Sequence, residues 1–255
     1  MPDWDFARVF AVVRRVLAGF FALSWYTFPG FGLIDLTVTW NAEWPQALEA
    51  GWGLYMTLFV GVPFTVIAVR GRAFLQAAVA QLYVAVGALI VSAIVSTEWP
   101  LVLWALVIAL ETMIVAGLPS PRRCNLSARP TKLLMVPLVL GAIPWMVYAV
   151  AMWDLNRQDR PDADITVGID HYSVQGAYGL ALLGLVTLAA LWPAARLLAA
   201  TCAGLSAVYL GVVSWAWHPT QGSFNQTWSV LCALWGLVVI LLAVLTRPRR
   251  SRSER

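Results

Sequence analysis

The stretch PLVLWALVIALETMIVAGL, residues 100–118, decides the fold class of this chain. A helix needs about 20 mostly apolar residues to cross the hydrocarbon core of a lipid bilayer. This stretch has that length and contains one charged side chain, Glu111, with no lysine or arginine. We therefore predict a membrane-spanning helix that carries a single acid near its middle.

Seven further stretches of similar length and composition flank this one. The eight expected spans are approximately residues 9–28, 51–69, 74–96, 100–118, 133–153, 174–192, 197–217 and 228–246. The 255-residue chain is 60% hydrophobic and 12% charged, and so few polar residues could not coat a soluble core of this size. The sequence predicts an all-α, polytopic integral membrane bundle of about eight transmembrane helices.

We expect one membrane domain over residues 1–255, with outer loops at 29–50 and 154–173. The first span is the least regular, because it contains Arg14 and Arg15. Arginines about one turn from a helix end can extend to the lipid headgroups. A cleaved signal peptide is the alternative interpretation, but no small-x-small cleavage site follows the apolar stretch. We therefore expect the first span to be retained.

The distribution of positive charge predicts the orientation, because cytoplasmic loops of membrane proteins are enriched in lysine and arginine. Eight spans place both termini on one side, and that side carries 15 of the 17 lysine and arginine residues. Arg157 and Arg160 are the two that lie opposite, where most of the acids gather. We predict a multi-pass protein of a cell membrane (plasma or inner membrane) with cytoplasmic N- and C-termini.

Several function classes are disfavoured by this pattern. The basic tail, residues 247–255, follows a hydrophobic span, so we interpret it as a topology anchor facing anionic lipid and expect no nucleic-acid partner. The sequence has no Walker motif and no CxxCH, and its one lysine, Lys132, lies at the inner boundary. We therefore predict no cofactor; the lipid bilayer itself is the expected partner.

Glu111 is the sharpest candidate for function. An ionised carboxylate near the bilayer centre costs at least ~2.5 kcal/mol, so such residues face protein or water and often have a function. Gln81, on the preceding span, lies at a similar depth, and antiparallel neighbours would allow a Gln81–Glu111 hydrogen bond. The alternative is a protonated Glu111 that only ties two helices together.

The two histidines form a second candidate group at the outer boundary. His171, with Asp170 before it, leads into the sixth span, and His218 ends the seventh. Metal binding would need three or four converging ligands, and the sequence has neither HExxH nor the GxSxG elbow of a hydrolase. We therefore predict no metal site and no catalytic residue, and expect helix capping or headgroup contacts unless these residues contact a ligand.

Small residues mark faces on which helices can approach closely. The relevant positions are Gly176, Gly179 and Gly184 on the sixth span and Ala200, Gly204, Ala207 and Gly211 on the seventh. These faces would allow a homo- or hetero-oligomer. Pro63 on the second span and Pro137 and Pro144 on the fifth are expected to bend their helices locally.

Three functional hypotheses remain. The first is a small permease-like or ligand- or lipid-binding bundle, more plausible than an enzyme, with Glu111, Gln81 and the His171–Asp170 group along its pathway. The second is a membrane-embedded enzyme that acts on a lipid-linked substrate at the outer leaflet through His171 and His218. The third is a scaffold or accessory subunit of a membrane complex.

Overall fold

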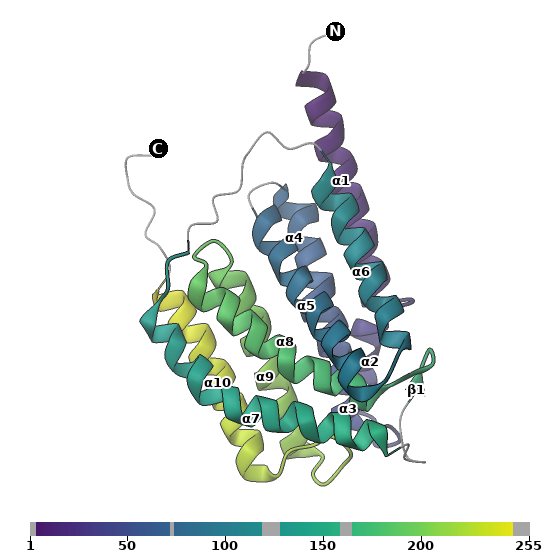
Figure 1. Cartoon of the computed structure of the whole chain (residues 1–255), viewed down its shortest axis with the longest axis vertical. Helices are drawn as coiled ribbons and strands as arrows, with labels where there is room; N and C mark the ends of the chain where they lie inside the picture. The colour runs from purple at the N-terminus through teal and green to yellow at the C-terminus, as the bar shows by residue number, and fades with distance from the viewer. Residues whose placement is uncertain (1–3, 72–73, 119–127, 159–164, 247–255) are drawn as a thin grey trace.

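The computed structural model describes residues 4–71, 74–118, 128–158 and 165–246, which are mostly helical (Figure 1). Among these residues, eight helical segments are long and apolar enough to span a membrane, which confirms the all-α class and the expected number of apolar spans. Seven of them are single helices: α1 (Trp4–Tyr26), α5 (Leu75–Ser96), α6 (Pro100–Gly117), α7 (Lys132–Arg157), α8 (His171–Leu191), α9 (Arg196–Ala216) and α10 (Gln226–Leu245).

The second span is composite. It consists of α3 (Gln46–Leu54), the π-helix η1 (Tyr55–Gly61) and α4 (Val62–Arg70). Its π-helical section is almost completely buried. Short π-helical turns within longer helices are rare and frequently occur at functional sites.

Both expected outer loops contain more regular structure than predicted. In the first, a short helix α2 (Gly32–Val38) forms and α3 already begins at Gln46. In the second, α7 continues to Arg157 before an antiparallel hairpin of β1 (Ile165–Thr166) and β2 (Ile169–Asp170) leads directly into α8. The tail at 247–255 lies outside the described residues.

Helix α8 lies at the centre of the bundle and packs against α3, α5, α7 and α9. Helices α1, α6 and α10 lie at the periphery (Figure 1). Their outer faces carry rows of exposed apolar side chains, such as Phe20 on α1, Leu103 on α6 and Leu241 on α10. Apolar surface of this extent is unusual in water, and it fits helices that contact lipid.

The small-residue faces pack within the chain. A Cβ atom added at Gly204 of α9 would lie 2.6 Å from the carbonyl oxygen of Gly236 in α10. On α8, Gly176 packs against Trp153 of α7 and Gly184 against Val84 of α5. The close approaches expected from these glycines are therefore intramolecular, and association with a second chain stays a prediction.

Two buried arginines donate to carbonyls at helix C-termini, where the last four carbonyl groups lack intrahelical donors. Arg14 is 1% exposed and donates from Nε to the carbonyl oxygen of Val115, 3.0 Å away, and from Nη2 to that of Leu118, at the end of α6. Arg14 therefore does not extend to the headgroups as expected. Arg196 similarly joins the ends of α8 and α10, donating to Ala189 (3.1 Å) and Thr246 (2.8 Å).

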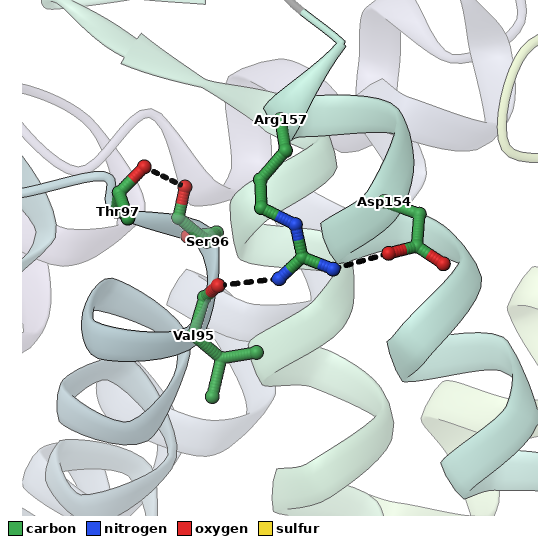
Figure 2. Close-up of polar contacts among 5 residues, drawn as sticks. All are labelled: Val95, Ser96, Thr97, Asp154 and Arg157. Carbon is green, nitrogen blue, oxygen red and sulfur yellow. Dashed lines mark hydrogen bonds and ion pairs between the residues drawn. The ribbon is translucent and has the colours of Figure 1, made fainter.

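A third arginine does the same at the opposite end of the bundle. Figure 2 shows the Arg157 guanidinium between the carbonyl oxygen of Val95, 2.6 Å from Nη1, and the carboxylate of Asp154, with which it forms an ion pair. Val95 belongs to the last turn of α5, and Thr97 just beyond it has a left-handed conformation. A cation near a helix C-terminus also interacts favourably with the helix dipole.

Candidate functional site

A cavity of about 360 Å³ lies between α7 and α10. We call it the α7–α10 cavity, and its volume is typical of small-ligand pockets, which range over about 300–1,000 Å³. Its lining is mainly hydrocarbon and aromatic: Val136, Pro137, Leu140, Gly141, Pro144, Trp145, Phe224, Trp228, Leu231, Cys232, Leu234, Trp235, Val238 and Leu242. No charged side chain is among these described lining residues.

The sequence of α7 explains why a cavity forms there. Pro137, Gly141 and Pro144 follow the i, i+4, i+7 spacing, so they share one helix face that carries no long side chain. A Cβ at Gly141 would lie 2.7 Å from Nε1 of Trp235. The indole donates from this atom to the carbonyl oxygen of Pro137, 2.8 Å away, which fixes the contact between the two helices.

The inner wall of the cavity is an aromatic cluster around Trp145, which is 5% exposed. Its ring meets those of Tyr178, Phe224 and Trp235 edge-to-face, with centroids 5.7–6.0 Å apart. Such pairs contribute about 0.5–1.5 kcal/mol each beyond their buried area. The wall is therefore well packed.

The other side of the cavity opens on the surface that fits lipid contact. Leu140 and Leu234 line it and are 68% and 52% exposed. On α10 the lining extends from Trp228 to Leu242, which is about 21 Å at 1.5 Å per residue. That length covers much of the ~30 Å hydrocarbon core of a bilayer.

Gln81 has a structural partner in the π-helix. The N–H of Val62 bonds to the carbonyl oxygen of Thr57, five residues earlier, and Pro63 has no N–H to offer the next carbonyl, that of Leu58. Gln81 supplies the missing donor, with Nε2 lying 3.0 Å from the Leu58 oxygen. Its expected hydrogen bond to Glu111 is not formed.

Glu111 instead contacts α1. Its Oε2 accepts a hydrogen bond of 2.6 Å from the indole of Trp25, which is 2% exposed. Glu111 itself is half-buried between α1 and α6. The two residues predicted as partners are thus held by different elements, Gln81 by η1 and Glu111 by α1.

Asp170 and His171 lie at the start of α8, where Asp170 caps the helix. Its carboxylate accepts from the backbone N–H of Tyr172 at 2.8 Å, which is the ordinary capping role considered above. The His171 ring is completely buried and stacks on Trp52 of α3, with centroids 4.8 Å apart. Two acids, Asp35 of α2 and Glu49 of α3, are also buried. The local sequence pattern gave no indication that Glu49 would be buried.

His218 lies elsewhere, on an exposed position in the loop between α9 and α10. Within the described part of the chain, its ring makes no contact with that of His171, and no group of three or more His, Cys, Asp or Glu side chains could hold a metal ion. The two rings therefore lie in different surroundings, one buried and one exposed, and a joint role of the two histidines stays a prediction.

Tryptophan rings connect the Glu111 and His171 regions. Trp25 meets Trp104 at a centroid distance of 5.2 Å, and Trp104 meets Trp52, the stacking partner of His171, at 5.7 Å. The sequence-predicted residues are thus linked by packed rings of α1, α3 and α6.

The α7–α10 cavity was not predicted, although its signal was present in the spacing of Pro137, Gly141 and Pro144. Comparisons add no relative: neither family models, curated proteins nor solved structures match this chain.

Proposed function

We propose that this chain is a multi-pass protein of a cell membrane that binds the hydrocarbon chain of a lipid in the α7–α10 cavity. Both termini face the cytoplasm in this proposal, which is supported by the 15 of 17 lysine and arginine residues on that side. This proposal is a specific form of the first hypothesis above, in which the bundle binds a ligand or lipid: it names the ligand as a lipid chain and the site as the α7–α10 cavity.

The observation that carries the proposal is the match between the cavity and a lipid chain. The cavity is elongated along α10, is open beside exposed leucines, and is lined by apolar side chains. An extended hydrocarbon chain can enter sideways from the bilayer without exposing polar groups. A polar solute would lose its hydration here without gaining hydrogen bonds in return.

We expect the cavity to select among lipid chains and not to bind any of them with high affinity. A lipid tail leaves hydrocarbon to enter hydrocarbon, so the hydrophobic effect supplies little net free energy. The gain comes from dispersion contacts with the aromatic wall around Trp145. Chains that fill the cavity should therefore be retained over bulk lipid.

Lipid retention by cavity variants tests the proposal. We would purify the protein in mild detergent, incubate it with dioleoylphosphatidylglycerol, and count bound lipids by native mass spectrometry. Leu234→Trp should remove one bound lipid, because the larger ring fills the cavity.

The matched control is Leu237→Trp, also on α10, at a leucine that is 53% exposed but does not line the cavity. This variant should retain the wild-type number of lipids. Equal retention by wild-type protein and Leu234→Trp would refute lipid binding in the cavity.

A further inference from the structure

Glu111 is a membrane-depth carboxyl group with incomplete hydrogen bonding. It lies 11 residues beyond Pro100 in α6, about 16 Å along the helix and so near the middle of a ~30 Å hydrocarbon core. Among the described residues its one polar partner is Trp25, which occupies Oε2. No donor from the described residues reaches the second oxygen.

This carboxyl group is accessible from the lipid-facing side. The residues three and four positions away on α6 fall into two groups: Ile108 and Val115 are completely buried, whereas Val107 and Ile114 are 39% and 40% exposed. Glu111 therefore lies at the edge of the α1–α6 contact. A hydrophobic ligand could reach it directly from the bilayer.

Two packed indole rings, those of Trp25 and Trp104, extend from the carboxyl group along the contact between α1 and α6. Trp104 lies two turns before Glu111 on the same face of α6 and packs edge-to-face on Trp25, with centroids 5.2 Å apart. Trp104 is half-buried. Indole faces attract cations by about 0.5–2 kcal/mol, most strongly where water is excluded.

Among the described residues, no arginine or lysine forms an ion pair with Glu111. Arg14 of α1 is directed to the carbonyl groups of Val115 and Leu118, and Arg15 lies near Gly71. When this carboxyl group ionises, it therefore calls for a positive charge from outside the chain. Such a charge must be carried by an apolar molecule to reach this depth.

We propose that Glu111, with Trp25 and Trp104, forms a binding site for a lipophilic organic cation, such as a quaternary ammonium or phosphonium ion. The carboxylate supplies the opposite charge, Trp25 orients it, and the face of Trp104 contacts the cation. This site is separate from the α7–α10 cavity and does not depend on lipid binding there.

Tetraphenylphosphonium binding tests this site. With radiolabelled probe and protein in phosphatidylcholine nanodiscs, Glu111→Gln should raise the Kd at least about tenfold, since it removes the charge from a water-poor site. The amide oxygen can still accept from Trp25, which preserves the α1–α6 contact. Trp104→Leu should weaken binding to a smaller extent.

Two controls separate this site from other binding. Glu43→Gln, on an exposed outer-loop acid, and the cavity variant Leu234→Trp should both keep the wild-type Kd. An unchanged Kd in Glu111→Gln would overturn the proposal. A rise in Kd in Glu43→Gln as large as that in Glu111→Gln would do the same. If Leu234→Trp alone weakened tetraphenylphosphonium binding, the probe would be assigned to the α7–α10 cavity. That result would also overturn the proposal.

Wild-type protein offers a test that does not require a variant to fold. Dicyclohexylcarbodiimide adds to a protonated carboxyl group, whose proton moves to a carbodiimide nitrogen, and rearranges to a stable N-acylurea without a leaving group. Tetraphenylphosphonium should protect Glu111 from this adduct, as measured by peptide mass spectrometry. Labelling that is unaffected by the cation would contradict the site.

Discussion

Gln81 donates a hydrogen bond of 3.0 Å to the carbonyl oxygen of Leu58, which the backbone of the second span leaves without a donor. Pro63 causes this vacancy, because it lacks an N–H at the position where the π-helix needs one. A side chain on α5 thus completes the hydrogen bonding of another span. This bond gives Gln81 a structural role, and its part in a transport pathway stays a prediction.

The Gln81–Leu58 bond leads to a test by double mutation. Gln81→Leu should lower the free energy of unfolding by about 1–3 kcal/mol, the cost of leaving a buried acceptor unpaired. In a Pro63→Ala background the new N–H can reach the Leu58 carbonyl, so the same substitution should cost less. Thermal denaturation in detergent measures both.

Gln76→Leu is the matched control on α5, since Gln76 is half-buried and makes no hydrogen bond among the described residues. It should leave the melting temperature nearly unchanged. If Gln81→Leu lowered the free energy of unfolding equally in both backgrounds, Pro63 would not be the reason that the Leu58 carbonyl lacks a backbone donor.

The contact between α9 and α10 predicts a contrast between two glycines. Gly204→Ala should destabilise the protein by about 1–3 kcal/mol, because its Cβ would meet the Gly236 carbonyl oxygen at 2.6 Å. Gly87→Ala on α5, where nothing lies within 4 Å, should be neutral or stabilise by up to about 1 kcal/mol. Melting temperatures that rank the two variants the other way would contradict this packing.

Neighbouring arginines on α1 should differ in their importance. Arg14→Met removes the donors to Val115 and Leu118 and should cost about 1.5–3 kcal/mol, the value of a hydrogen bond to a charged group. Arg15→Met, at an exposed position, should cost much less. Chemical denaturation of the two variants measures the difference, and similar values would argue against the capping role of Arg14.

Orientation can be tested with the natural Cys124, which lies between α6 and α7. A membrane-impermeant maleimide should label it only after the cells are permeabilised, because this segment is on the expected cytoplasmic side. In a Cys124→Ser background, Asn225→Cys at an exposed position before α10 should label in intact cells. The reverse pattern would invert the proposed topology.

The spans could be predicted from the sequence because length and hydropathy are properties of each segment alone. The expected span of 74–96, for example, corresponds to Leu75–Ser96, and that of 197–217 to Arg196–Ala216. The composite second span could not be predicted in this way, since its π-helix depends on Pro63 together with a donor from α5.

The partners of the candidate residues required knowledge of which helix faces meet. Glu111 and Gln81 lie on consecutive spans, but α6 turns the Glu111 side towards Trp25 of α1. Burial of His171 likewise depends on Trp52, more than a hundred residues earlier. The α7–α10 cavity is a property of two helices together, and periodicity within one helix gives only the small-residue face of α7.

Photo-crosslinking with a lipid that carries a diazirine in its acyl chain tests the central claim most directly. In membranes containing this lipid, the account predicts that adducts concentrate on the α7 and α10 peptides that contain Leu140 and Leu234, and that Leu234→Trp abolishes this enrichment. Adducts spread evenly over the exposed faces of α1, α6 and α10, with no change in Leu234→Trp, would contradict lipid binding in the cavity.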